Sequence, residues 1–283
     1  MPQPQPAIPA DPVSSQVDIL DRQGFILLDS IIGPSLLEDL RTDLASANKK
    51  CFEFQQQHHV GNRKNSDDNP LGADGALGGA AHHVLPLGSS FVEFLEQQYC
   101  FDIISNFLGG KFILNAFGGV TNTRDNNMYE HCLIVHRDAR SFHPSFRQML
   151  WMLVMLDDFT EDNGATLLLA GSHTQEHKPQ DEIFFSNAAK AIGKAGSIAL
   201  FDGRLWHACG RNNTDRPRRA LTLAFTLPFI KPQMDYVRAF GPEKVSQMSD
   251  NMKQLLGYHA RVPANHDEWY QPPENRFYQS NQG

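Results

Sequence analysis

Apolar positions along the chain follow a helical period near the N-terminus. Residues 24–29 have the pattern of a short strand, and Gly33-Pro34-Ser35 then opens an amphipathic helix whose leucines recur on one stripe. Residues 90–107 repeat the helical pattern, which ends at Gly109-Gly110. The first part of the chain is therefore predicted to contribute a strand and two helices.

The middle of the chain has the pattern of strands. Apolar or alternating runs bounded by turn residues cover 112–120, 133–138, 148–157, 165–170, 197–201 and 219–229. Several strands without intervening helices predict an antiparallel sandwich or barrel. Residues 237–256 return to a helical pattern, so we expect 230–283 to form a C-terminal helix and an irregular tail.

Two segments interrupt this periodicity. Residues 1–15 contain repeated prolines and are predicted to be a flexible arm, with 16–283 forming a single domain. Residues 55–87 are rich in Gly, Asn, Asp, Ala and His, which predicts a long loop that is either a substrate lid or disordered. The pairs His58-His59 and His82-His83 in this loop could bind a metal, although solvated loop histidines are the simpler interpretation.

Composition narrows the possible partners. The 283 residues have a formal net charge of -7 and no basic run, which argues against nucleic acid or an anionic membrane and favours a small-molecule substrate. Neither a bilayer-length apolar segment nor a signal core is present, so we expect a cytoplasmic protein. The 4 cysteines have no CxxC spacing and are interpreted as ordinary thiols. Nothing in the pattern predicts an oligomeric state.

The candidate chemistry begins at His136-Arg137-Asp138. On a strand, His136 and Asp138 point to one face while Arg137 points to the other. His207 follows a predicted strand and a tight turn at Asp202-Gly203. Two histidines and one carboxylate form the facial triad of non-haem iron(II) oxygenases, which is the metal site that we predict.

Two arginines follow this triad on the last predicted strand. A polar turn over 212–217 leads to Arg218 and Arg219, and alternation allows only one of them to face the same cavity as His207. A guanidinium inside an apolar cavity needs an anion, and its planar shape suits a carboxylate. The distal carboxylate of 2-oxoglutarate is the candidate.

At these residues the chain resembles the phytanoyl-CoA dioxygenase-like (PhyH) branch of the iron(II)/2-oxoglutarate-dependent oxygenases. Residues 24–40 are similar to the opening strand and helix of that family, and 156–173 to its central hairpin ending in Gly-Ser-His. The resemblance implies a mainly β fold with flanking helices, built on a double-stranded β-helix (jelly-roll, cupin-like) barrel. It also implies that His136, Asp138 and His207 are the catalytic ligands of Fe(II).

The family interval after His207 favours Arg218 over Arg219 as the 2-oxoglutarate-binding arginine. The resemblance further implies that Thr166 hydrogen-bonds the same carboxylate and that the Asn115 amide contacts the cosubstrate, although a strand threonine also packs across strands. Dioxygen is the second cosubstrate, with succinate and carbon dioxide released. Asp138 stands where halogenating relatives make room for chloride, which implies oxidation rather than chlorination.

Three residues near these motifs are interpreted as structural. His173 is assigned to the hairpin, and Gly164 and Gly203 to turns. A protein kinase, which shares the His-Arg-Asp triplet, is excluded because His143 stands where its catalytic loop needs asparagine.

Two alternatives remain open: a non-oxidative cupin-like metal enzyme, such as an isomerase or hydrolase, and a catalytically silent binding protein. For the substrate we expect a secondary-metabolite intermediate, in a pocket lined by 55–87, 140–146, 177–188 and the C-terminal tail. Arg140 and Arg204 could meet an acidic substrate, or could simply be solvated.

Overall fold

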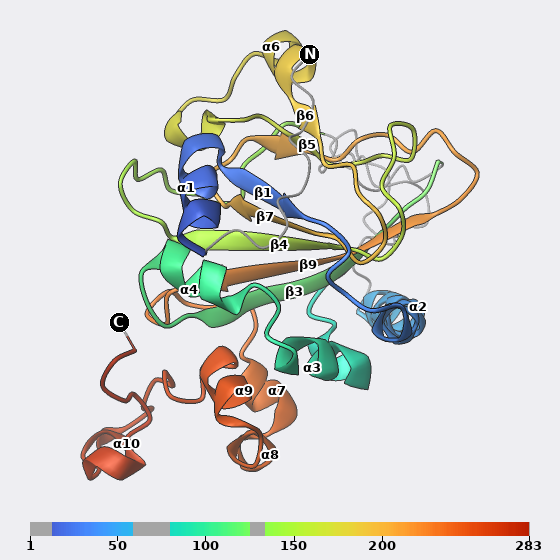
Figure 1. Ribbon diagram of the computed structural model, residues 1–283. Helices are drawn as coiled ribbons and strands as arrows, with labels where there is room; N and C mark the ends of the chain where they lie inside the picture. The colour runs from blue at the N-terminus through green and yellow to red at the C-terminus, as the bar shows by residue number, and fades with distance from the viewer. Residues whose placement is uncertain (1–12, 59–79, 125–133, 283) are drawn as a thin grey trace.

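The computed structural model describes residues 13–58, 80–124 and 134–282 (Figure 1). Helix α1 (Val13–Gln23) begins inside the segment predicted as a flexible arm, whose residues 1–12 lie outside the described ranges. Strand β1 (Phe25–Leu28) and helix α2 (Pro34–Gln57) follow where they were predicted. Pro34 occupies the first turn of α2, where the missing N–H costs no helical hydrogen bond. Of the predicted 55–87 loop, residues 59–79 lie outside the described ranges.

The helix predicted over 90–107 is in fact two helices. These are α3 (Ser89–Glu96) and α4 (Phe101–Leu108), separated by a turn in which Gln98 and Cys100 have φ angles of 55° and 63°. Left-handed backbone ends an α-helix. The apolar pattern gives no sign of this break, because Phe94 and Tyr99 stack across it with ring centroids 5.6 Å apart.

Two antiparallel sheets form the centre of the molecule. Within the described residues the larger sheet has the order β1-β7-β4-β9-β3-β2 and the smaller one β6-β5-β8. Most strands of the larger sheet coincide with predicted runs. The bounds are β2 (Ala80–Ala81), β3 (Ile113–Asn122), β4 (Met149–Met155), β5 (Leu167–Leu168), β6 (Ala189–Lys190), β7 (Ile198–Asp202), β8 (His207–Ala208) and β9 (Arg218–Thr226).

The two faces of the larger sheet carry different side chains. Leu150, Met152 and Val154 of β4 belong to the core that includes residues of the helices, whereas Leu153 and Met155 belong to a second core shared with the smaller sheet. On this inner face, strand register places Ala199 beside Leu153, Ala220 beside Met155 and Ala224 beside Trp151. On the neighbouring strand β3, Ala116 lies beside Ala224 and Gly118 beside Thr222.

The strand predicted over 133–138 is not formed by its described part. His136 makes a single antiparallel bridge with His207, and the N–H groups of Asp138 and Ala139 then both donate to one carbonyl, that of Gly203. Two successive N–H groups bound to one oxygen cannot continue a ladder, in which alternate groups point to opposite sides. The run predicted over 165–170 is likewise reduced to β5.

Short helices complete the fold. The helical return predicted at 237–256 is divided into α7 (Tyr236–Phe240), α8 (Pro242–Ser246) and α9 (Asp250–Leu255), with Gly241 at a φ of 89° between the first two. Figure 1 shows these helices near α3, with the C-terminal tail beyond them. The remaining elements are η1 (Leu85–Leu87), η3 (Ser172–Thr174), α6 (Asp181–Asn187), α10 (His266–Trp269) and η4 (Pro273–Asn275).

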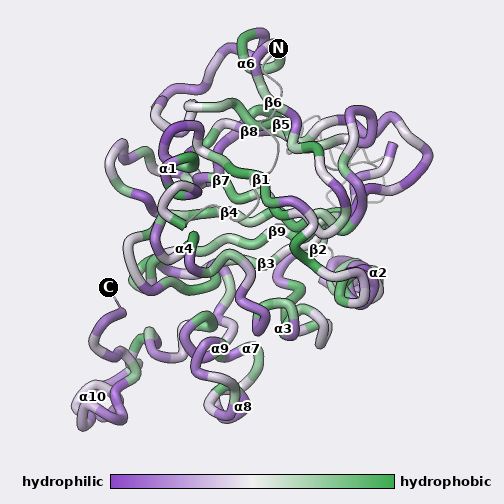
Figure 2. Tube along the Cα trace, viewed as in Figure 1, coloured by the Kyte–Doolittle hydropathy of each residue, from purple (hydrophilic) through white to green (hydrophobic). Residues whose placement is uncertain are grey.

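Hydropathy follows this arrangement. Figure 2 shows apolar residues concentrated on the central strands β4, β7 and β9, and polar residues on the tail around α10. Among the described helices, none is both long and apolar enough to cross a membrane. With its many helices and two antiparallel sheets, the fold is a mixed α/β arrangement, and it contains more helix than the predicted mainly β fold.

Candidate metal and cosubstrate site

The three predicted metal ligands lie close together beside β8, where His136 forms an isolated bridge with His207. The ligand atoms of His136, Asp138 and His207 all lie within 4.8 Å of one another. Nε2 of His207 is 3.4 Å from Oδ2 of Asp138, and Nε2 of His136 is 3.9 Å from Oδ1. Reciprocal backbone hydrogen bonds of 2.9 and 2.8 Å hold His136 beside His207. The structure thus brings together the predicted triad.

The backbone fixes the hydrogen on each imidazole. Nδ1 of His136 lies 2.8 Å from the carbonyl oxygen of Ile134, and Nδ1 of His207 lies 3.0 Å from that of Leu205. A carbonyl oxygen only accepts, so Nδ1 carries the hydrogen in both rings and each Nε2 carries the lone pair with which an imidazole binds a metal. Each of the two histidine rings is therefore oriented by a backbone carbonyl of its own segment.

The electrostatics of the site favour an uncharged imidazole at His136. The pKa of His136 is lowered below its ordinary value of 6.5, first by burial and then by the neighbouring His207, and these effects outweigh the attraction of Asp138. A neutral imidazole is the form that binds a metal ion. The triad is thus prepared for a divalent cation at neutral pH.

A cavity of about 260 Å³ contains the triad together with the predicted Arg218 and Thr166. Arg218 comes from the start of β9 and Thr166 from the residue before β5, so the two sheets both contribute to its walls. Phe201 and Leu153 add apolar surface. The predicted metal ligands and the predicted cosubstrate residues therefore share one enclosed space.

Arg218 is 1% exposed and incompletely satisfied. Its Nη2 donates to the carbonyl of Gly164 at 2.7 Å, and its guanidinium carbon lies 4.3 Å from the ring centroid of Phe159. The Nε of Arg218 has no hydrogen-bond partner among the described residues. Burial lowers the pKa of the Arg218 guanidinium, and the neighbouring Cys209 partly counteracts this effect. A buried cation that lacks a counter-ion is costly, so this geometry fits an anionic ligand.

The neighbouring Arg219 faces the other way, as alternation requires. It is partly exposed and bonds Asp157 through Nη2 at 2.8 Å and Nε at 2.9 Å. Salt-bridge formation raises its pKa. Of the two candidate arginines, the structure therefore places only Arg218 in the cavity.

Asn115 is not brought into the cavity. It is buried at a β-bulge and donates its amide hydrogens to the carbonyl of Lys231 at 3.2 Å and to the hydroxyl of Thr226 at 3.4 Å. Its side chain thereby fastens the segment after β9 to β3. Its predicted contact with the cosubstrate remains a prediction that these neighbours do not support.

Other residues near the motifs have structural contacts. His173 is buried and donates from Nε2 to the carbonyl of Asp21 at 3.1 Å, in agreement with its predicted role in the hairpin. Gly164 has a φ of 84°, as a turn glycine needs. Gly203 instead permits a close approach, because an added Cβ would lie 3.1 Å from that of Met149.

The structure contradicts both interpretations of Arg204, as a contact for an acidic substrate and as a solvated side chain. Arg204 is buried and forms an ion pair with Asp202, with 2.6 Å between Nη2 and Oδ2. Its charge is neutralised inside the protein, so it is not available to a ligand. Arg140, the other candidate, is exposed and does not line the cavity.

Several residues of the cavity were not assigned to it from the sequence. Trp151 contributes a buried Nε1 donor that has no partner among the described residues, and Cys209 lies between the metal ligands and Arg218. Alternation from His207 would have placed Cys209 on the same face. Trp151 could only be found from the strand register, which pairs it with Phe201.

The opposite wall of the cavity carries two histidines from the predicted 55–87 loop. His82 and His83 both line it, and burial lowers the pKa of each. Nδ1 of His83 is 3.3 Å from the hydroxyl of Tyr236, and Gln233 lies on the same wall. The predicted lining segments 140–146 and 177–188 contribute none of the described lining residues, whereas 55–87 and the C-terminal region do.

Comparison with known proteins identifies the family. Residues 20–220 match the family described as phytanoyl-CoA dioxygenase (PhyH). The chain belongs to the PhyH family. PhyH proteins are iron(II)/2-oxoglutarate-dependent dioxygenases, and this member has the His-Asp-His facial triad of such enzymes.

Relatives share most of the chain. The uncharacterized protein Rv1501 of Mycobacterium tuberculosis is 41% identical over 263 residues, which cover 89% of this chain and 92% of Rv1501. Dioxygenase sphC of Aspergillus fumigatus is 26% identical over 253 residues, which cover 85% of this chain and 66% of sphC. Both similarities cover more than four fifths of this chain.

Solved structures with little sequence identity have a similar fold. AviO1 from Streptomyces viridochromogenes superposes with a TM-score of 0.58 at 18% identity, covering 80% of this chain and 99% of AviO1. The non-heme alpha ketoglutarate dependent epimerase SnoN, from nogalamycin biosynthesis, gives a TM-score of 0.56 at 14% identity, covering 76% and 82%. The arrangement of sheets and helices is therefore shared with these two proteins.

Proposed function

We propose that this protein is an iron(II)- and 2-oxoglutarate-dependent dioxygenase that hydroxylates or otherwise oxidises a small molecule, a secondary-metabolite intermediate. One observation carries the proposal: a facial triad and an incompletely paired buried arginine share one cavity. For hydroxylation, substrate, 2-oxoglutarate and dioxygen become hydroxylated substrate, succinate and carbon dioxide. The PhyH membership supports the same reaction class.

The described residues fit both ligands of such an enzyme. His136, Asp138 and His207 would hold Fe(II), and Arg218 with Thr166 would bind the distal carboxylate of 2-oxoglutarate. When bound, the iron supplies the redox chemistry with dioxygen, in the positions that three protein ligands leave open. Arg218 neutralises and orients the cosubstrate, and its own position is set by Gly164.

The substrate is proposed to occupy the remaining part of the cavity, next to His82, His83 and Gln233. Apolar side chains on the inner face of the larger sheet exclude water from this part. Among the described lining residues, Asp138 is the only carboxylate and Arg218 the only permanent cation. The substrate half therefore offers hydrogen bonds rather than a strong charge.

We further propose that the two sheets form a double-stranded β-helix within one domain, residues 16–283. The bridge between His136 and His207 adds the 134–138 segment to the smaller sheet beside β8. This places a fourth chain segment opposite the larger sheet, as that fold requires. The similarity to AviO1 and SnoN supports the proposal.

Anaerobic titration tests the function without knowledge of the substrate. Metal-free protein is given Fe(II) and then 2-oxoglutarate, and the visible charge-transfer band of the chelate is recorded. We expect the band for the wild type and for Asp250→Asn, an exposed carboxylate control, and its loss for His207→Ala. A wild type that binds metal without the band contradicts the proposal and favours a non-oxidative metal enzyme. Succinate release in air then screens candidate substrates.

A further inference from the structure

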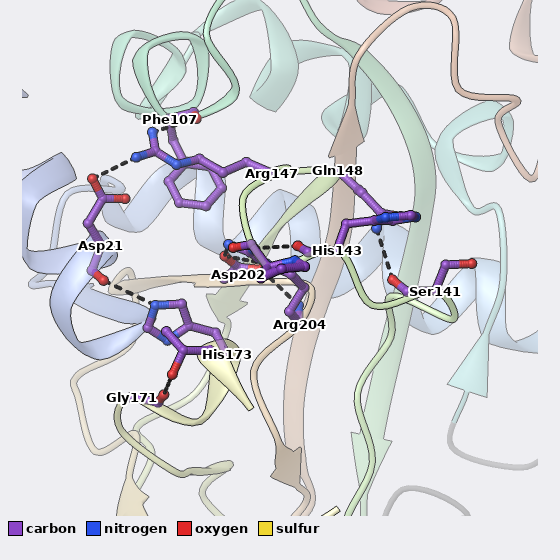
Figure 3. Close-up of polar contacts among 12 residues, drawn as sticks. Asp21, Phe107, Ser141, His143, Arg147, Gln148, Gly171, His173, Asp202 and Arg204 are labelled. Carbon is purple, nitrogen blue, oxygen red and sulfur yellow. Dashed lines mark hydrogen bonds and ion pairs between the residues drawn. The ribbon is translucent and has the colours of Figure 1, made fainter. Parts of the chain in front are cut away.

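A buried ion pair lies directly beside the metal ligands. Asp202 ends β7, and both its oxygens accept from Arg204: Nε is 3.0 Å from Oδ1, and Nη2 is 2.6 Å from Oδ2 (Figure 3). The backbone N–H of Arg204 also donates to Oδ1 at 2.8 Å. The carboxylate thus closes a tight turn around Gly203 and fixes the plane of the guanidinium.

The other edge of this guanidinium holds a different part of the chain. Nη1 of Arg204 donates to the carbonyls of His143 and Pro144 at 2.9 and 2.8 Å (Figure 3). Both carbonyls belong to residues 139–148, the connection between the ligand Asp138 and β4, which we call the excursion. Arg204 is therefore the link between this excursion and the turn that precedes His207.

The same turn binds both ends of the excursion through Gly203. Its carbonyl accepts from Asp138 at 3.1 Å and from Ala139 at 2.8 Å, and its N–H donates to the carbonyl of Met149 at 3.0 Å. The β-bridge ends at His136, so no strand pairing holds Asp138 itself. The position of this ligand depends on the 202–204 turn.

We propose that Asp202 and Arg204 form a positioning pair, which holds Asp138 opposite His207 before a metal ion binds. This inference rests on the proposed function, since it concerns the metal site of that function. Arg204 acts through backbone groups and touches no ligand of the metal, so it is a positioning residue. A planar guanidinium has five N–H groups in a fixed fork, so it binds both carboxylate oxygens and two carbonyls in one plane, whereas the ammonium of lysine has only three N–H groups and no fixed plane.

Energetics favour a positioning role over simple stabilisation. Removing two charges from water costs about as much as their attraction returns, so a buried pair adds little net stability compared with apolar packing. Its contribution is a fixed geometry. Here that geometry is imposed on the one triad member that lacks support from a strand.

Arg147 offers a matched control in the same region. It donates from Nη2 to Asp21 at 2.7 Å and from Nη1 to the carbonyl of Phe107 at 3.0 Å, and so combines a carboxylate with a carbonyl as Arg204 does (Figure 3). Its contacts join α1 and α4 to the start of β4. Arg147 itself lies in the excursion, but its contacts do not include the 202–204 turn or Asp138, so its loss should leave the triad in place.

The test compares Arg204→Lys with Arg147→Lys in the full chain. Three properties are measured on metal-free protein: the thermal unfolding midpoint, hydrogen exchange of peptides that contain 136–148, and affinity for Co(II) from its visible spectrum. For Arg204→Lys we expect faster exchange at Asp138 and Ala139 and roughly tenfold weaker Co(II) binding, as for other outer-shell partners of metal ligands. Arg147→Lys should keep both properties within about twofold of the wild type, a margin far below that outer-shell effect.

The outcomes separate this inference from the proposed function. If folded Arg204→Lys retains wild-type exchange and Co(II) affinity, the positioning role is refuted. If that variant fails to fold, Asp202→Asn, which keeps an oxygen acceptor, is judged by the same two measurements. A wild type that binds Co(II) but forms no iron and 2-oxoglutarate chromophore refutes the proposed function, while exchange and Co(II) affinity still decide the positioning role.

Discussion

Replacing Arg218 by methionine tests the cosubstrate site most directly. The substitution keeps much of the side-chain length and removes the cation that lies over Phe159 with an unpartnered Nε. Cosubstrate affinity should fall strongly, because no other described residue lining the cavity is a permanent cation. Arg219→Met is the matched control, since Arg219 has the same charge but bonds Asp157 on the other face.

The size of the effect follows from the burial of Arg218. A hydrogen bond to a charged group contributes roughly 1.5–3 kcal/mol, and removing one partner of a buried pair costs roughly 3–5 kcal/mol. We therefore expect a loss of about 3 kcal/mol. At about 1.4 kcal/mol for each tenfold change, this corresponds to roughly 100-fold weaker binding of 2-oxoglutarate.

The assay is the anaerobic titration of the Fe(II) protein with 2-oxoglutarate, followed by the charge-transfer band. Arg219→Met should stay within about twofold of the wild type, as expected when no hydrogen bond to the ligand is lost. Without cosubstrate, Arg218→Met should unfold at the same temperature as the wild type or higher, since it removes a buried charge that lacks a counter-ion. Unchanged affinity in Arg218→Met, or a large loss in Arg219→Met, would refute the strand register and the role together.

Three further predictions address other parts of the structure. Thr166→Val should weaken 2-oxoglutarate binding about fivefold, the value of one hydrogen bond of about 1 kcal/mol, and Thr160→Val should not. Gly119→Ala should lower the free energy of unfolding by roughly 1–3 kcal/mol, because the added methyl overlaps Leu44. In denaturant titration, the double variant with Leu44→Ala should lose less stability than the sum of the two single variants. Folding lowers the pKa of His136, so the unfolded chain binds more protons below pH 6.5 and metal-free stability should fall there. Urea midpoints that do not change across that range would contradict this pKa shift.

The triad and its arginine could be predicted because their signals are local. His136 and Asp138 are next-nearest neighbours, and on an extended segment a backbone that points one of them inward points the other the same way. Arg218 and Arg219 are adjacent on a strand, so alternation reduced the choice to one of two, and the PhyH resemblance made the choice. The structure agrees with that choice because β9 pairs on both sides, which fixes which face points inward.

The positions of other residues depend on distant partners that no local pattern contains. Arg204 was expected either near the substrate or in solvent, but it is buried and donates hydrogen bonds to the carbonyls of His143 and Pro144. Asp138 was expected on a strand, but the carbonyl of Gly203 accepts from the N–H groups of both Asp138 and Ala139, which ends the strand pairing. Trp151 reaches the cavity through the register of β4 with β7. In each case the deciding contact joins segments far apart in sequence.

The bridge between His136 and His207 determines the order in which this protein folds and binds its metal ion. Each histidine is oriented by a carbonyl of its own segment, yet the two rings meet only after the backbone groups of these distant residues have bonded each other. Closing so long a loop is entropically costly and comes late unless other contacts precede it. A nascent or partly unfolded chain consequently lacks the complete triad. Metal capture should then report that the 134–138 segment has paired with β8, and bound metal should stabilise only the folded protein.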